Sequence, residues 1–133
     1  MKTLIAGSEA LKHWLGDAHW RTPADIDYIG YSVDCPFDLR SFSEEIPNFL
    51  FTDKRHRKEF FSADLCEPLR KLIVRSVDDT YLDLRSCLIM KNAHKHFYLG
   101  KFRKSFKHLE DYSHLLDYVQ LSEEEKQISI LVS

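Results

Sequence analysis

Residues 6–14 read AGSEALKHW, and they join a short apolar run to an amphipathic pattern. The run TLIAG at residues 3–7 predicts a buried strand that ends at Gly7. Ser8 is expected to cap the helix that follows, because a serine hydroxyl can accept a hydrogen bond from a backbone N–H of the first turn. Apolar side chains recur on one face of this helix, which is expected to stop at Gly16. The chain is thus predicted to open with a strand, a Gly-Ser turn and a helix.

A second stretch, RTPADIDYIG at residues 21–30, follows after a short turn. Its alternation of side chains predicts a strand over residues 25–32. Side chains two apart on a strand share a face, so Asp25 and Asp27 are expected to project side by side. The bland interpretation is an exposed edge strand with a solvated acidic face, or Asp25 capping the turn at Pro23.

The fold class expected for the chain is α/β, of the α+β type. A short helix is expected near residues 37–42, a hairpin from strands 48–52 and 58–64, and a helix over 66–77 with Pro68 in its first turn. After residue 78 apolar residues recur at helical spacing, in DTYLDLRSCLIMKNAHKHF and again in KFRKSFKHLEDYSHLLDYVQL. We expect one domain over residues 1–133, with a sheet-containing core at 1–77 and a mainly helical part at 78–133.

Composition narrows the class of protein. The 133 residues are 44% hydrophobic and carry a formal net charge of −2, as in a folded domain without an overall basic field. Three cysteines without a paired spacing fit a reducing compartment, so a cytoplasmic protein is expected. The first residues contain too short an apolar stretch for a signal peptide, and no apolar run approaches the length that spans a bilayer. No membrane association is expected.

The two aspartates suggest a chemistry. Neighbouring carboxylates repel each other unless a cation lies between them. Mg²⁺ prefers carboxylate oxygens together with phosphate oxygens of a substrate. Backbone N–H groups at a helix start attract phosphate, and a glycine there allows close approach. Gly7 and Ser8 are therefore candidate phosphate-binding residues beside a metal site at Asp25 and Asp27.

This order of a strand, Gly-Ser, a helix and Asp-x-Asp on a strand resembles the signature of the nucleotidyltransferase superfamily. Gly7, Ser8, Asp25 and Asp27 match the motif, although the gap between Ser8 and Asp25 is somewhat longer than usual. The resemblance implies a minimal mixed sheet with flanking helices, Mg²⁺ as cofactor and an NTP as substrate. It also implies a third metal-binding carboxylate on a later strand.

Glu59 is the candidate for that third carboxylate, since it lies in the hairpin strand expected to neighbour the Asp-x-Asp strand. Asp64 is the reserve, but it lies at the strand end, where it could instead cap the next helix. The bland interpretation of Glu59, a charged residue on the solvent face of the hairpin, has about equal weight.

The resemblance extends to a narrower group, the small nucleotidyltransferase-like proteins of tailed bacteriophages. These proteins share the motifs GS-A and P-DID-I, in which a dash is any residue, and a hairpin strand that contains a glutamate. A helix in that pattern corresponds to KNAHKHF here, and it implies Lys91 and His94 near the nucleotide. Exposed polar helix faces explain such residues more often than ligand binding does. For a phage protein the expected location is the host cytoplasm.

A basic run lies in the predicted hairpin turn. It contains Lys54, Arg55, Arg57 and Lys58, with His56 between them. The bland interpretation is a solvated turn whose charge protects a sheet edge. The functional interpretation is a patch that contacts nucleic acid or a host protein.

Three hypotheses remain open at the level of sequence. The first is a Mg²⁺-dependent nucleotidyltransferase that moves NMP from an NTP to an unknown acceptor, which could be a macromolecule; Asp25 and Asp27 hold the metal, and Glu59 activates the acceptor. The second is an inactive protein of the same fold that binds nucleotide, nucleic acid or a host protein. The third is an oligomeric accessory protein with its aromatic C-terminal helices as the interface.

Overall fold

The computed structural model describes residues 3–18, 23, 25–44, 49–97, 110, 113–114, 120 and 122–126. These residues fall into two compact units, Met1–Asp83 and Leu84–Ser133. The first unit contains the whole sheet and two helices of nine residues each. The second contains helix α3 (Leu84–Phe97).

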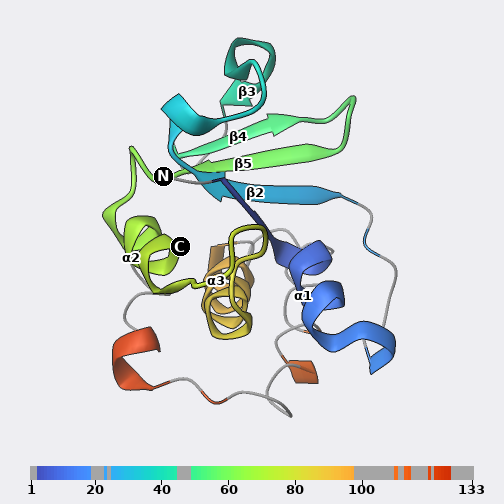
Figure 1. Cartoon of the computed structure of the whole chain (residues 1–133), viewed down its shortest axis with the longest axis vertical. Helices are drawn as coiled ribbons and strands as arrows, with labels where there is room; N and C mark the ends of the chain where they lie inside the picture. Colours follow the sequence, from blue (N-terminus) through green and yellow to red (C-terminus); the bar gives the residue numbers. More distant parts are fainter. Residues whose placement is uncertain are drawn as a thin grey trace. The chain divides into compact units, whose positions relative to one another are not determined.

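The sheet has five strands in the order β1-β2-β5-β4-β3. In chain order the elements of the first unit are β1 (Leu4–Ala6), α1 (Gly7–Leu15), β2 (Ile26–Gly30), β3 (Ser43–Glu44), β4 (Leu50–Asp53), β5 (Lys58–Ser62) and α2 (Glu67–Arg75). Strands β2 and β5 run parallel, and all other neighbours run antiparallel. The mixed sheet with flanking helices confirms the expected α+β fold (Figure 1).

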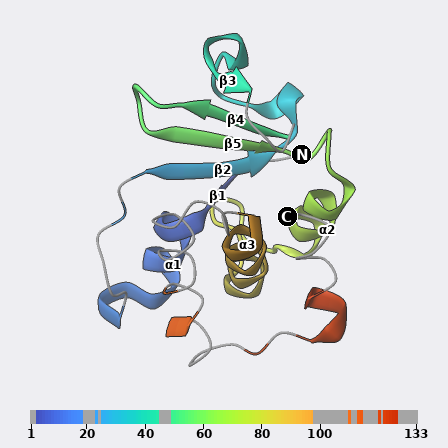
Figure 2. The ribbon, with the colours of Figure 1, turned by 180° about the vertical axis from the view of Figure 1, so that it is seen from behind.

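Alternating side chains of the sheet build the core. Position for position, the register places one set of apolar side chains on a single face. This set is at most 4% exposed: Leu4, Ala6, Ile29, Leu50 and Phe61. Helices α1 and α2 lie on one side of the sheet, as Figures 1 and 2 show. Their buried side chains are Ala10 and Leu11 in α1, and Leu69, Leu72 and Ile73 in α2.

The segment between β2 and β3 covers the opposite face of the sheet. The ring of Phe37 lies 4.7 Å from that of Tyr28, edge to face, and the Lys58 ammonium sits 4.4 Å from the centre of the Phe37 ring. This segment carries two short 3₁₀ turns, Ser32–Asp34 and Leu39–Ser41. The short helix expected over residues 37–42 is therefore only a single 3₁₀ turn.

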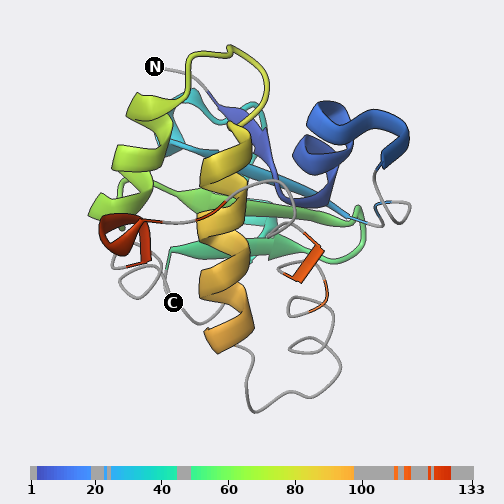
Figure 3. The ribbon, with the colours of Figure 1, turned by 90° about the horizontal axis from the view of Figure 1, so that it is seen from below.

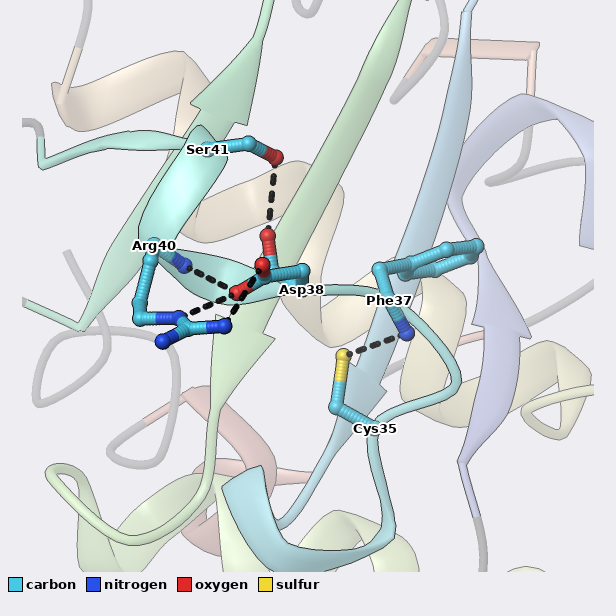
Figure 4. Close-up of polar contacts among 5 residues, drawn as sticks. All are labelled: Cys35, Phe37, Asp38, Arg40 and Ser41. Atoms are coloured by element: carbon cyan, nitrogen blue, oxygen red, sulfur yellow. Dashed lines mark hydrogen bonds and ion pairs between the residues drawn. The ribbon is translucent and has the colours of Figure 1, made fainter.

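Hydrogen bonds local to this segment hold its shape (Figure 4). Asp38 accepts from the backbone N–H of Arg40 at 3.0 Å and from its guanidinium at 3.0 and 3.1 Å. These contacts lower the pKa of the Asp38 carboxyl below its usual value. The Ser41 hydroxyl donates to the Asp38 carbonyl at 2.8 Å, and the Phe37 N–H donates to Cys35 Sγ at 3.4 Å. Phe37 is thereby placed where its ring can cover the sheet.

Residues 80–82 run beside β1 instead of starting a helix. The Ile5 N–H donates to the Thr80 carbonyl at 2.7 Å, and the Leu82 N–H donates to the Ile5 carbonyl at 2.8 Å. Trp14 Nε1 also donates to the Leu82 carbonyl at 2.7 Å. The helix expected from residue 78 therefore begins only at Leu84, and Leu82 belongs to the first unit.

In the second unit, an ion pair links α3 to a short helical turn at residues 123–126. Arg85 Nε donates to Glu125 Oε2 at 3.1 Å, and its guanidinium also donates to the Gln120 carbonyl at 2.9 Å. Glu125 is buried, and the Ser122 N–H donates to it at 2.9 Å. The helical stripe expected between residues 101 and 121 lies mostly outside the described residues.

The remaining boundaries follow the sequence patterns closely. Helix α2 has Pro68 in its first turn, and β4 and β5 form the expected antiparallel hairpin. Within the described part of the chain, no helix has both the length and the apolar character needed to cross a membrane.

Candidate active site at the amino ends of strands β2 and β5

The junction between β1 and α1 requires a glycine. Gly7 has a φ of +59°, a backbone region that residues with side chains rarely adopt. A Cβ atom at this position would overlap Asp27 Oδ2 and would stand 3.0 Å from Asp27 Cγ. Gly7 therefore lets the start of α1 come directly against the carboxylate of Asp27.

Ser8 lies inside the helix and does not cap it. The N-cap position of α1 is Ala6, which makes no side-chain capping bond. Ser8 is in the first turn and is 8% exposed. The expected serine cap is thus wrong, because the left-handed conformation of Gly7 starts the helix one residue earlier. Ser8 nevertheless lies in the first turn of α1, where backbone N–H groups favour negative charge.

Asp27 and Glu59 lie opposite each other on neighbouring strands. Their Cα atoms are register partners in the parallel pair of β2 and β5. Register partners point to the same face, and neighbouring strands are about 4.8 Å apart. Both residues are half-buried. The expectation that Glu59 lies on the strand next to Asp27 is confirmed.

The side chains of this pair are of the type that binds a hard cation. The first turn of α1, where backbone N–H groups favour negative charge, lies against one of the two carboxylates, because Gly7 packs against Asp27. Mg²⁺ is typically bound by one or two carboxylates plus substrate phosphates, which matches the two carboxylates present here.

Asp25 lies outside the strand. Strand β2 begins at Ile26, and Asp25 is an exposed residue in the bend before it. The expected side-by-side arrangement of Asp25 and Asp27 on one strand is therefore not what the structure shows. In the described ranges, no group of three or more His, Cys, Asp or Glu side chains is placed to hold a metal ion together. The site is a pair built from Asp27 and Glu59.

The reserve carboxylate, Asp64, has a structural role. Its Oδ2 atom accepts from the backbone N–H of Ser32 at 3.1 Å. The N-cap of α2 is Cys66 and makes no side-chain capping bond, so Asp64 does not cap that helix. Asp64 instead ties the segment after β5 to Ser32, two residues beyond the end of β2, at the opposite end of these strands from Asp27.

Two further predicted residues belong to the second unit. Lys91 in α3 is 4% exposed, so its ammonium is not on an open surface. The backbone of His94 lies in α3, but its side chain is outside the described residues.

The basic run forms the tip of the β4–β5 hairpin. Lys54, Arg55, His56 and Arg57 are exposed, and Arg57 has a φ of +54°. Lys58 differs from them because its ammonium lies over the Phe37 ring. Asp53, which was not predicted from the sequence, anchors the turn. Its Oδ2 lies 2.7 Å from His56 Nδ1, and its Oδ1 accepts from the His56 N–H at 3.3 Å. An aspartate three residues before a histidine in a turn is the signal that could have indicated it.

Comparisons with known proteins found no match to this chain. No protein-family model matches the chain, and neither a curated protein nor a solved structure matches it. Any functional conclusion therefore depends on the residues of the site itself.

Proposed function

We propose that this protein is a Mg²⁺-dependent nucleotidyltransferase that moves NMP from an NTP to an acceptor hydroxyl. The observation that supports this most is the meeting of three features at one place in the sheet. The glycine turn into α1 packs against Asp27, and Asp27 lies in register with Glu59. A phosphate-binding helix start and a pair of metal-binding carboxylates are the two parts that this chemistry needs.

Each residue has a distinct role in the proposal. Asp27 and Glu59 hold the metal ion, and Asp25 reaches it from the bend before β2 when nucleotide is bound. The backbone at Gly7 and the hydroxyl of Ser8 contact the triphosphate. Bound Mg²⁺ would neutralise charge on the phosphates. Glu59 accepts the proton of the acceptor hydroxyl as that oxygen attacks the α-phosphorus and pyrophosphate leaves.

A second candidate is a protein that binds nucleotide without turnover. The position of Asp25 outside β2 favours it, because a carboxylate in an exposed bend is a weak metal ligand. The same Asp27–Glu59 pair would still bind Mg²⁺ together with a nucleotide. The two candidates differ only in whether an acceptor is modified.

Isothermal titration of each NTP in the presence of Mg²⁺ tests the shared part of both candidates. We expect binding to the wild type that requires Mg²⁺ and is lost in Asp27→Asn and in Glu59→Gln. Asp17→Asn is the matched control, since Asp17 is an exposed carboxylate outside the site. Absence of binding to a well-folded wild type would reject both candidates.

Incubation with an α-labelled NTP and candidate acceptors then separates the two. Label transfer that Glu59→Gln abolishes supports the transferase. If nucleotide binds but no acceptor class takes the label, the binding protein is the better description.

A further inference from the structure

The β4–β5 hairpin presents a concentrated positive charge on an otherwise acidic chain. Of its 19 lysine and arginine residues, the chain places four within residues 54–58, although its net charge is −2. Four consecutive residues at the tip, Lys54 to Arg57, are exposed. Such a local patch attracts polyanions even when the whole protein does not.

The structure separates these cations into two kinds. The Lys58 ammonium lies over the Phe37 ring, so its charge stabilises the packing of that ring on the sheet. Lys54, Arg55 and Arg57 make no ion pair with any acidic side chain in the ranges that the structure describes. Three cations at the tip are thus available to an external partner.

The turn itself is held by local contacts. Asp53 accepts from the His56 backbone and pairs with its ring, and this hydrogen bond lowers the pKa of the Asp53 carboxyl. Arg57 closes the turn in the left-handed region, and its carbonyl accepts from the Ile26 N–H at 3.0 Å. The tip is therefore tied to the start of β2.

This tie places the tip at the same end of the sheet as the carboxylate pair. Arg57 is two residues before Glu59, and Ile26 is directly before Asp27. The β4–β5 turn projects on the side of the first unit where α1 lies, as Figures 1 and 3 show.

We infer that the hairpin tip binds the phosphate backbone of nucleic acid through Lys54, Arg55 and Arg57. Three exposed cations attract a polyanion, and arginine forks match phosphate oxygens. Binding at the tip stands independently of the carboxylate pair. If the bound nucleic acid is also the acceptor of the transferred NMP, that additional role rests on the proposed function.

Fluorescence anisotropy of a labelled single-stranded oligonucleotide tests the inference through its salt dependence. Neutralising three phosphates of a single strand gives a slope of log K against log salt of about −2, or about a 20-fold loss of affinity between roughly 50 and 200 mM salt. We expect Lys54→Gln/Arg55→Gln/Arg57→Asn to bring the slope close to zero. Asparagine is chosen at Arg57 because it tolerates a positive φ.

The control removes the same number of exposed cations elsewhere, as Arg40→Gln/Lys71→Gln/Lys126→Gln. This control is expected to keep the slope of the wild type. An unchanged slope in the tip variant, or no binding at low salt, would overturn the inference. Displacement of the oligonucleotide by polyglutamate at equal charge would overturn it as well, in favour of an acidic protein partner.

Asp27→Asn distinguishes this surface from the proposed function. The variant is expected to keep the oligonucleotide affinity of the wild type while losing Mg²⁺-dependent NTP binding. If it loses both, the tip is not an independent binding surface and the inference is wrong. If the wild type does not bind NTP, the proposed function is rejected, and the anisotropy measurement alone tests whether the hairpin tip binds nucleic acid.

Discussion

Asp27 and Glu59 are register partners in the parallel pair of β2 and β5. Both carboxylates are half-buried, and the Asp27 carboxylate lies against the start of α1. Two carboxylate side chains on one face of neighbouring strands can bind one hard cation together.

Mg²⁺ is expected to stabilise the wild type and neither Asp27→Asn nor Glu59→Gln. A ligand at about 100 times its Kd raises the free energy of unfolding by about 2.7 kcal/mol, which is a shift of several degrees in Tm. Thermal unfolding with increasing Mg²⁺ measures this. Asp17→Asn should respond as the wild type does, and an equal shift in Asp27→Asn would place the cation elsewhere.

Gly7→Ala is expected to destabilise the protein more than Gly16→Ala. Both glycines have positive φ, +59° and +55°, so alanine costs about 1 kcal/mol at each position from the backbone alone. Only at Gly7 does the added Cβ meet another residue, the Asp27 carboxylate, whereas nothing lies within 4 Å at Gly16.

Urea unfolding of the two variants gives the difference in the free energy of unfolding. We expect the Gly7 variant to lose roughly 1–3 kcal/mol beyond the loss at Gly16. Equal losses would mean that the close approach of α1 to Asp27 does not constrain the fold.

The Arg85–Glu125 pair predicts a loss of stability in acid. Hydrogen bonds from Arg85 lower the pKa of the buried Glu125 carboxyl to about 2 from an ordinary value of 4.5. Because the pKa is lower in the folded state, the stabilisation is complete above about pH 4.5 and is lost as the pH falls toward 2. Its size is of the order of 1–3 kcal/mol.

Urea unfolding of wild type and Glu125→Gln as a function of pH checks this. The difference between them should shrink as the pH falls from about 5 to about 2. Glu123→Gln is the control, since Glu123 is 88% exposed in its pair with Lys126 and should change stability little at any pH. A difference between wild type and Glu125→Gln that does not vary with pH would contradict the lowered pKa.

Lys58 and Phe37 are expected to be coupled energetically. The ammonium lies 4.4 Å from the ring centre, within the range of a cation–π contact. A double-mutant cycle with Lys58→Met and Phe37→Leu should give a coupling of about 0.5–1 kcal/mol. A coupling energy of zero would mean that Phe37 does not hold the Lys58 ammonium, which would then be available at the hairpin tip like the other cations.

Much of this fold could be predicted because its signals are local. Alternation in DIDYIG predicted β2, the hairpin pattern predicted β5, Pro68 marked the start of α2, and Gly16 marked the end of α1. The hairpin strand that carries Glu59 was expected to neighbour the Asp-x-Asp strand, and β5 pairs with β2 as expected.

The predicted secondary structure was wrong where contacts between distant segments determine it. Leu82 has helical spacing with the residues after it, but the Ile5 backbone and the Trp14 indole hold its segment as an edge beside β1. Asp25 has strand spacing with Asp27, but pairing with β5 begins only at Ile26.

Local patterns were enough to predict the kinds of elements, the glycine turn and the positions of the acidic residues, because propensity and periodicity act over a few neighbouring residues. Only the folded chain shows that Asp27 meets Glu59 in register, that Gly7 packs against Asp27, and that Lys58 lies over Phe37 while Arg57 stays exposed. These relationships depend on strand register and on packing across the sheet, and both are set by contacts between segments far apart in the chain.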